Sequence, residues 1–261
     1  MYIDAPPQWG CVDFISDLHL QVADTATFDA WSHYLHDTTA DAVFILGDLF
    51  EVWVGDDVLS DGASFEARCT QVLAEAATLR SVYIMHGNRD FLMGQQLMAA
   101  CGAQLLSDPC VLTLAGERWV LTHGDALCLD DLPYQEFRTS VRSAAWQQAF
   151  LAKPLAERQQ IARALRDQSE ARKAVETQYA DVDTTAAIAP LREANAHHMI
   201  HGHTHKPGHH VLGHHLERTV LSDWDLLAHI PRAEVLRITA STTARERVRR
   251  IAPAEATMTR G

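Results

Sequence analysis

The stretch Val12-Asp13-Phe14-Ile15-Ser16-Asp17-Leu18-His19 joins a short apolar run to two side chains that can bind a metal ion. The same arrangement recurs four times along the chain. Apolar runs at 42–46, 82–85, 119–122 and 198–200 lead directly into Gly47-Asp48, Gly87-Asn88-Arg89, His123-Gly124-Asp125 and Gly202-His203-Thr204-His205. Short runs rich in β-branched and aromatic residues are typical of buried strands. Because open α/β sheets bind ligands at the carboxyl ends of their strands, we expect the five motifs to meet in one crevice.

Each motif taken singly is a weak signal, since it is more often structural than catalytic. Asp17 and His19 alternate, so both can reach one ion if the backbone stays strand-like at the turn, and His203 and His205 alternate in the same way. Asp48 follows a glycine that permits a sharp turn, which suits a carboxylate bridging two cations about 3.5 to 4 Å apart. The five motifs in this order, all at strand ends, together predict a two-metal phosphoesterase.

The side chains of these motifs form a mixed ligand set of two carboxylates, one amide oxygen and four imidazoles. Such a set suits Mn²⁺, Fe²⁺ or Zn²⁺ better than Mg²⁺ or Ca²⁺. Four further histidines, His209, His210, His214 and His215, leave open a second hypothesis, a His-rich metal-binding protein without enzymatic activity. We interpret those four as surface or hairpin residues.

The composition narrows the class of protein. A chain of 261 residues with 47% hydrophobic content can bury a substantial core, and we expect one main domain over 1–261. Its five cysteines are widely spaced and odd in number, which fits a reducing cytosol better than a disulfide framework. Neither a signal peptide nor an apolar run of roughly 18 to 20 residues is present, so we expect no secretion or membrane span. The net charge of −12 argues against nucleic-acid binding.

Between the predicted strands, periodic apolar residues predict helices over 25–36 and 64–79. Runs 111–114 and 119–122 predict a hairpin, while 210–212, 219–221 and 234–238 are expected to extend a second sheet. The stretch of about 130–182 is almost free of glycine and predicts helices broken near Lys153-Pro154, which indicates an inserted helical cap. The basic, weakly patterned tail over about 241–261 is expected to be flexible.

The order of the motifs resembles that of the calcineurin-like metallophosphoesterase superfamily, in which Asp-x-His, Gly-Asp, Gly-Asn, His and Gly-His-x-His follow one another. The resemblance covers nearly the whole chain except the tail. It implies an α/β fold, a four-layer α/β/β/α sandwich of two mixed sheets. It also implies one metal held by Asp17, His19 and His205, a second held by Asn88, His123 and His203, and Asp48 shared between them.

One departure from that superfamily concerns Gly87-Asn88-Arg89-Asp90, where the usual motif has histidine in the third position. Arginine does not act as a general acid near neutrality, but its planar guanidinium binds two phosphoryl oxygens at once. A phosphoanhydride releases a phosphate group that needs little protonation, so Arg89 and the metals would suffice. The departure therefore indicates hydrolysis of a pyrophosphate bond.

Three longer blocks, Gly87–Leu92, His123–Gln135 and Ile200–Pro207, are similar to the UDP-2,3-diacylglucosamine hydrolases of lipid A synthesis. That resemblance implies hydrolysis of UDP-2,3-diacylglucosamine to 2,3-diacylglucosamine 1-phosphate and UMP by a metal-activated water that attacks the uridine-side phosphorus, with Mn²⁺ as cofactor. The cap would hold the acyl chains, with an apolar stripe of Trp146, Phe150, Leu151 and Leu155. From the pattern alone, the stripe is more readily a helix face packed on the main sheet.

The same resemblance assigns roles to individual residues. The catalytic set is Asp48, Asn88, Arg89 and His123. The substrate would be contacted by Asn88, Arg89, Asp131, Tyr134, Ser169, Arg172, Lys173 and His203, of which Arg172 and Lys173 stand in for family residues that do not align cleanly.

A lipid substrate in the inner leaflet implies that the protein is cytoplasmic and reversibly contacts the cytoplasmic face of the inner membrane. We expect a monomer. A broader nucleotide pyrophosphatase or phosphodiesterase on the same scaffold is the main enzymatic alternative, and it would turn over an unacylated UDP-sugar equally well.

Overall fold

The computed structural model describes residues 1–175, 181–240 and 248–257, with the side chains of 167–175 left aside. Its strands form two six-stranded sheets, in the orders β12-β11-β2-β3-β4-β5 and β1-β6-β7-β8-β10-β9. The strands are β1 Tyr2–Asp4, β2 Cys11–Ile15, β3 Ala42–Leu46, β4 Ser81–Met85, β5 Gln104–Leu106, β6 Cys110–Leu114, β7 Glu117–Leu121, β8 His198–His201, β9 Gly208–Gly213, β10 Leu216–Val220, β11 Val235–Thr239 and β12 Val248–Ile251. The helices are α1 Thr25–Asp37, α2 Phe65–Ala77, α3 Gln95–Cys101, α4 Leu132–Val141, α5 Ala144–Leu151, α6 Leu155–Val175, α7 Thr184–Glu193 and α9 Pro253–Ala256, with short 3₁₀ turns η1 Asp56–Ser60 and η2 Asp125–Leu127.

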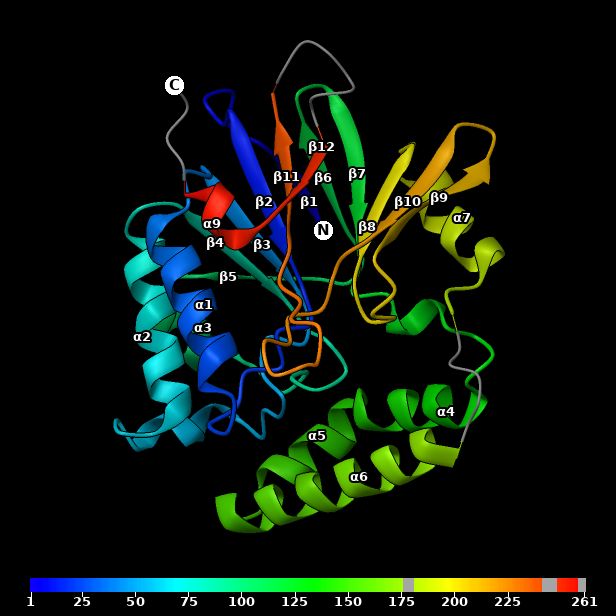
Figure 1. Ribbon diagram of the computed structural model, residues 1–261. Helices are drawn as coiled ribbons and strands as arrows, with labels where there is room; N and C mark the ends of the chain where they lie inside the picture. The colour runs from blue at the N-terminus through cyan, green and yellow to red at the C-terminus, as the bar shows by residue number, and fades with distance from the viewer. Residues whose placement is uncertain (176–180, 241–247, 258–261) are drawn as a thin grey trace.

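The sheets face each other and each carries helices on its outer side (Figure 1). Helices α1, α2 and α3 cover the sheet that contains β2, and α7 covers the sheet that contains β8. The predicted α/β/β/α sandwich is therefore confirmed, and so are the helices expected over 25–36 and 64–79 and the hairpin of β6 and β7.

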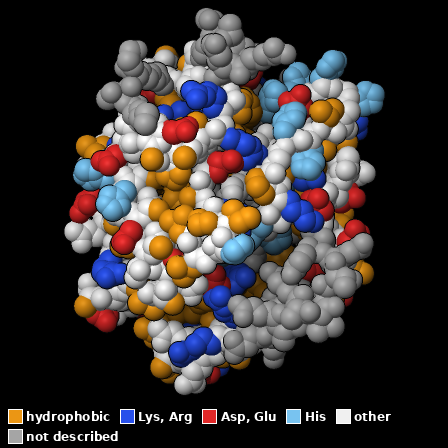
Figure 2. Space-filling model, viewed as in Figure 1, with side chains coloured by type: hydrophobic (Ala, Val, Ile, Leu, Met, Phe, Trp, Pro, Cys, Tyr) orange, Lys and Arg blue, Asp and Glu red, His pale blue; other side chains and the backbone are white. Residues whose placement is uncertain are grey.

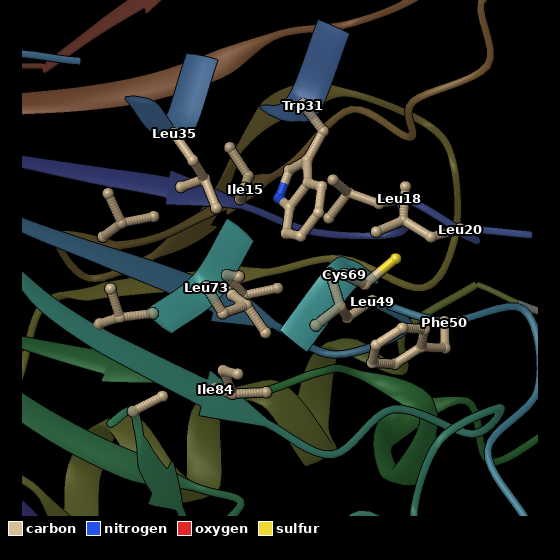
Figure 3. Close-up of a cluster of buried hydrophobic side chains, with 14 of the residues drawn as sticks. Ile15, Leu18, Leu20, Trp31, Leu35, Leu49, Phe50, Cys69, Leu73 and Ile84 are labelled. Carbon is tan, nitrogen blue, oxygen red and sulfur yellow. The ribbon is translucent and has the colours of Figure 1, made fainter. Parts of the chain in front are cut away.

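Alternation along the central strands explains the layers, because successive side chains of a strand point to opposite faces. Phe14 of β2 and Phe44 of β3 lie in the cluster between the sheets, where their rings stack with centroids 5.2 Å apart. Ile15 and Ile45, their neighbours along the chain, lie in the cluster under α1 and α2. Figure 3 shows Ile15 in that second cluster beside Trp31 of α1. A strand buried on both faces thus reads as the continuous apolar run seen in the sequence.

Two expectations about the C-terminal third of the chain are wrong. Residues 234–238 do not extend the second sheet: β11 pairs antiparallel with β2 in the first. The alternation of apolar residues predicts that a segment is a strand but does not predict which strand it pairs with. Here the connection from β10 to β11 is long enough to cross from one sheet to the other. The tail is also not flexible throughout, since β12 pairs with β11 and Ala256 of α9 is fully buried. Residues 241–247 and 258–261 lie outside the described part of the chain.

Helices α4, α5 and α6 form a separate layer across the ends of both sheets (Figure 1). The break between α5 and α6 falls at Pro154, as the sequence predicted. The apolar stripe faces the protein core: Phe150 is buried in the cluster under α1 and α2, and Trp146 and Leu155 pack against it. Leu151, by contrast, is 43% exposed. The stripe thus mainly attaches these helices to the body, as its pattern alone favoured.

The layout of the sheets brings the five motifs together. Strands β2, β3 and β4 are parallel to one another, as are β7 and β8, so the carboxyl ends within each set lie on one edge. These edges meet above α4 and α5 (Figure 1). Every motif follows directly on one of those strands.

Candidate metal centre

Five of the metal-binding side chains belong to residues whose backbone is left-handed. The φ angle is 55° at Asp17, 48° at His19, 51° at Asp48, 67° at His203 and 52° at His205. The strand-like backbone on which the alternation of Asp17 and His19 depended is therefore not found at these residues, because the strands end before the ligands and the chain turns at each one. Left-handed residues other than glycine cost about 1 to 3 kcal/mol each and are concentrated at functional sites.

Three of these side chains converge into one group, which we call the outer group: Asp17, His19 and His205. The Nε2 atoms of the two histidines lie 3.2 Å apart. Asp17 Oδ1 lies 3.4 Å from His205 Nε2 and 4.0 Å from His19 Nε2. The other Asp17 oxygen accepts a hydrogen bond from the backbone N–H of His203, at 2.9 Å.

A second set, the inner group, consists of Asn88, His123 and His203. Asn88 Oδ1 lies 3.0 Å from His123 Nε2 and 2.9 Å from His203 Nδ1. The His123 ring is fully buried, and its Nδ1 lies 2.9 Å from the carbonyl oxygen of Leu46. That contact leaves Nε2 for a ligand, as is usual for metal-binding histidines.

Asp48 lies between the two groups. Its Oδ2 atom is 4.0 Å from His19 Nε2 in the outer group and 3.8 Å from His123 Nε2 in the inner group. Its Oδ1 atom accepts the backbone N–H of Arg89, at 2.8 Å. One oxygen therefore fixes the carboxylate while the other faces both groups, the position that a bridging ligand needs.

The loops can approach this closely because two of them carry glycine at the point of contact. A Cβ atom at Gly87 would lie 2.0 Å from Asp48 Oδ1, and one at Gly202 would lie 2.2 Å from Asp17 Oδ2. Both distances are far inside van der Waals contact. The glycines of the Gly-Asn and Gly-His motifs therefore admit the carboxylates of the other motifs.

The residues fit divalent cations. Asp17 Oδ1 is buried and has no hydrogen-bond partner among the described residues, which is costly for a carboxylate oxygen unless a cation is bound. Two imidazole nitrogens bound to one ion at about 2.1 Å lie roughly 3.4 Å apart at a tetrahedral angle, close to the His19–His205 separation. Two sets of candidate metal ligands occur among the described residues, Asp17 with His19 and His205, and Asp17 with Asp48 and His123.

The two histidines of the inner group differ in pKa. Burial lowers the pKa of His123, but the carboxylates of Asp48 and Asp17 outweigh it and raise that pKa to about 9. Burial and the neighbouring His123 lower the pKa of His203 to about 3. Before a cation binds, His123 is therefore protonated and His203 neutral, so metal binding at this group must release a proton.

Two carboxylates that the sequence did not single out lie behind the outer group. Glu51 Oε2 is 3.2 Å from His19 Nδ1, and Asp223 Oδ2 is 3.6 Å from His205 Nδ1. Burial raises the pKa of Glu51, but its contacts with His19 and Arg89 outweigh that effect and hold the pKa below its ordinary value. Asp223 is fixed in turn by Arg232, whose Nη2 lies 2.7 Å away. Neither carboxylate stands in a motif, so no spacing in the sequence indicated them.

Helix α4 is attached to the metal centre through the His-Gly-Asp motif. Asp125 is fully buried and accepts hydrogen bonds from the Tyr134 hydroxyl and from Arg138 Nε, the latter at 2.8 Å. Burial raises the pKa of Asp125, but His123 and Arg138 outweigh it and keep the carboxylate ionised. The Tyr134 ring stacks on that of His203 with centroids 6.0 Å apart.

The other predicted substrate-binding residues are placed less uniformly. The Arg89 guanidinium forms an ion pair with Glu51 at the edge of the metal centre. Asp131 caps α4, where its carboxylate accepts the backbone N–H of Tyr134 at 3.1 Å. The side chains of Ser169, Arg172 and Lys173 lie outside the described part of the chain.

An open cavity of about 500 Å³ begins beside Glu51. It passes between the loops that follow β2 and β3 and the side of α6. Most of its lining is apolar and is formed by Leu20, Val22, Val52, Trp53, Val54, Val58 and Phe65. The charged residues of the lining are Glu51, Glu66, Arg163 and Arg166.

Comparison with known proteins identifies the family of the chain. The family model described as calcineurin-like phosphoesterase matches residues 12–207, and the chain therefore belongs to that family, whose members use divalent metal ions. The chain is 40% identical over 246 residues to a UDP-2,3-diacylglucosamine hydrolase of Stenotrophomonas maltophilia, covering 89% of this chain and 98% of that protein. It is 46% identical over 224 residues to the enzyme of the same name from Chromobacterium violaceum, covering 82% and 90%. A solved archaeal phosphodiesterase aligns over 92% of this chain and 98% of its own, with 13% identity and a TM-score of 0.46.

Within the described residues, none of the helices combines the length and apolar character needed to cross a bilayer.

Proposed function

We propose that the protein hydrolyses the pyrophosphate bond of UDP-2,3-diacylglucosamine, giving 2,3-diacylglucosamine 1-phosphate and UMP, in lipid A biosynthesis. The position of Asp48 between two groups of metal-binding side chains carries the proposal. It is supported by relatives with that name that align over most of their length.

The cofactor in this proposal is a pair of Mn²⁺ ions. Asp17, His19 and His205 would hold one and Asn88, His123 and His203 the other, with Asp48 shared. Bound in this way, the two cations would lower the pKa of a water molecule and neutralise charge on the phosphoryl oxygens.

The protein's own side chains bind and orient the diphosphate. Arg89, Asn88 and His203 border the place where the uridine-side phosphoryl group would lie. Arg89 supplies charge and no proton, which suits a sugar phosphate as leaving group. Water adds to the uridine-side phosphorus as its bond to the bridging oxygen breaks. Asp131, Tyr134, Ser169, Arg172 and Lys173 complete the proposed sugar-binding side.

We also propose that α4, α5 and α6 act as a cap over the substrate. The open cavity beside α6 is apolar over most of its lining and begins next to Glu51, close to the metal centre. It is therefore a better place for acyl chains than the stripe around Phe150, which the core already covers.

Contact with the cytoplasmic face of the inner membrane is the remaining part of the proposal. Large apolar side chains are exposed at the cavity and on the cap, including Val22 at 71% and Leu132 at 66%. Figure 2 shows hydrophobic side chains gathered on this face, beside a hollow in which Lys or Arg side chains are visible. Flotation with anionic liposomes at low salt should carry the protein upward, and its absence would contradict this part.

The direct test is release of UMP from the acylated substrate after chelation and again after addition of Mn²⁺. We expect activity only with the metal, and in ¹⁸O-water we expect the label in UMP. Label in the lipid phosphate would contradict the direction of attack. Equal turnover of an unacylated UDP-sugar would favour the broader nucleotide pyrophosphatase. Full function after Asp48→Ala would favour a non-enzymatic metal-binding protein.

A further inference from the structure

Glu51 is a buried carboxylate that contacts three side chains of different origin. It lies in the loop after β3, and 6% of its surface is exposed. One oxygen, Oε1, forms ion pairs with Arg89, which follows the ligand Asn88, and with Arg166 of α6. The other, Oε2, lies 3.2 Å from His19 Nδ1. No part of the hydrolysis described above requires Glu51.

The contact with His19 determines which nitrogen faces the metal centre. With Nδ1 directed at Glu51, Nε2 is directed at Asp17 and Asp48, each 4.0 Å away. A carboxylate behind a metal-binding imidazole fixes the ring orientation and increases its basicity.

The contacts with the arginines bring two positive charges to one point. The guanidinium groups of Arg89 and Arg166 meet the same carboxylate oxygen, although alone they would repel each other. Both side chains are partly exposed, and Glu51 and Arg166 line the cavity beside α6. The trio carries a net charge of +1 next to the metal centre, a suitable place for a phosphate group.

We propose that Glu51 is a positioning residue that orients His19 toward the metal of the outer group and holds Arg89 and Arg166 together as a two-arginine site for a substrate phosphate. This inference rests on the proposed function and adds a residue on α6 to the phosphate-binding set. It also links the attachment of the cap to the geometry of a metal ligand.

The first experiment measures metal binding without substrate. Chelated wild-type protein and Glu51→Gln are titrated with Mn²⁺ by calorimetry or electron paramagnetic resonance. We expect the variant to lose about 10- to 100-fold in affinity for one of two ions, the range typical of residues that support metal ligands. Unchanged affinity for both ions would overturn the role toward His19.

A matched control is available in Asp57→Asn. Asp57 pairs with Arg158, so this ion pair also joins the loops after β3 to α6 but touches no metal-binding side chain. If Glu51 acts only by attaching α6, the two variants should behave alike. Equal losses of Mn²⁺ affinity in both would therefore overturn the proposal.

The second experiment separates the two oxygens of Glu51. Arg166→Gln should raise KM for the acylated substrate about tenfold, as expected for one lost charge-assisted hydrogen bond, and leave both Mn²⁺ affinities unchanged. Glu51→Gln should change KM and one Mn²⁺ affinity together. An unchanged KM in Arg166→Gln would overturn the two-arginine site.

These results are distinguishable from failure of the proposed function. A wild-type protein that binds two Mn²⁺ ions but does not release UMP contradicts the substrate and leaves the effect of Glu51 on metal affinity measurable. A wild-type protein that is active while Glu51→Gln matches it in Mn²⁺ affinity and KM contradicts the inference alone.

Discussion

The outer and inner groups of the metal centre use similar ligands in different surroundings. In the outer group, the His205 side chain is 40% exposed. The carboxylates of Glu51 and Asp223 lie behind the two histidines of this group. The inner His123 is fully buried and backed by a main-chain carbonyl between the sheets. The inner group therefore has one histidine in the core, His123, whereas both histidines of the outer group are partly or largely exposed. Changes to the inner group should affect folding and metal binding together, and changes to the outer group mainly metal binding.

The largest effect should come from Asp48, which belongs to both groups. Asp48→Asn keeps the shape but removes the charge that faces His19 and His123, so we expect turnover to fall by more than about 10²-fold, the loss that a supporting residue alone can cause. UMP release at saturating Mn²⁺ measures it, with exposed Asp29→Asn as control. A variant with a tenth of wild-type turnover would show that Asp48 does not bridge.

Acid should destabilise the fold through His201, the buried last residue of β8. Burial, together with Arg218, lowers the pKa of His201 to about 4, below the 6.5 of an unfolded chain. Its stabilising contribution is thus complete above pH 6.5 and lost as pH falls toward 4, by at most about 3 kcal/mol. Urea unfolding of wild type and His201→Asn should differ more at pH 8 than at pH 5. A difference that does not change with pH would contradict the neutral buried imidazole.

Removing one histidine from each group sharpens the comparison further. In chelated protein, His123→Ala leaves a cavity and removes one of two hydrogen-bond donors to the Leu46 carbonyl, which keeps the Ser16 hydroxyl, so we expect a loss of about 1 to 3 kcal/mol in unfolding free energy. His19→Ala should cost less than about 0.5 kcal/mol, because the ring is partly exposed. Similar losses in the two variants would remove the distinction between the groups.

The smallest effect on turnover should come from Tyr134→Phe. The phenol donates a hydrogen bond to buried Asp125, while the ring stacks on His203. Loss of the hydroxyl alone should lower the unfolding free energy by about 1 kcal/mol and keep the stacked ring. Thermal unfolding checks the stability, and UMP release should stay within a few-fold of wild type. A much larger loss of turnover would indicate that the hydroxyl, and not only the ring, makes the proposed substrate contact of Tyr134.

Local sequence was sufficient for the strands that end at the motifs, because a strand buried on both faces is apolar at nearly every position, and the one buried acid of β2, Asp13, is paired with Arg237. Helix α1 was equally predictable, since Trp31 and Leu35 recur with helical spacing and face the core. Pairing was not, and β11 was assigned to the wrong sheet because a strand's pattern is the same whichever partner it finds. The left-handed backbone at Asp17 and His203 also escaped prediction, since neither residue requires it and only the surrounding contacts impose it.

The sequence by itself determined which side chains can bind metals and that each follows a strand, because ligand type and buried-strand composition are local properties. Only the tertiary structure decided that Asp48 lies between the two groups, that Glu51 joins His19 to Arg89 and Arg166, and that the stripe around Phe150 is covered. Those outcomes depend on contacts between segments that are far apart in the chain. The distances and the burial that such contacts create leave no pattern in the local sequence.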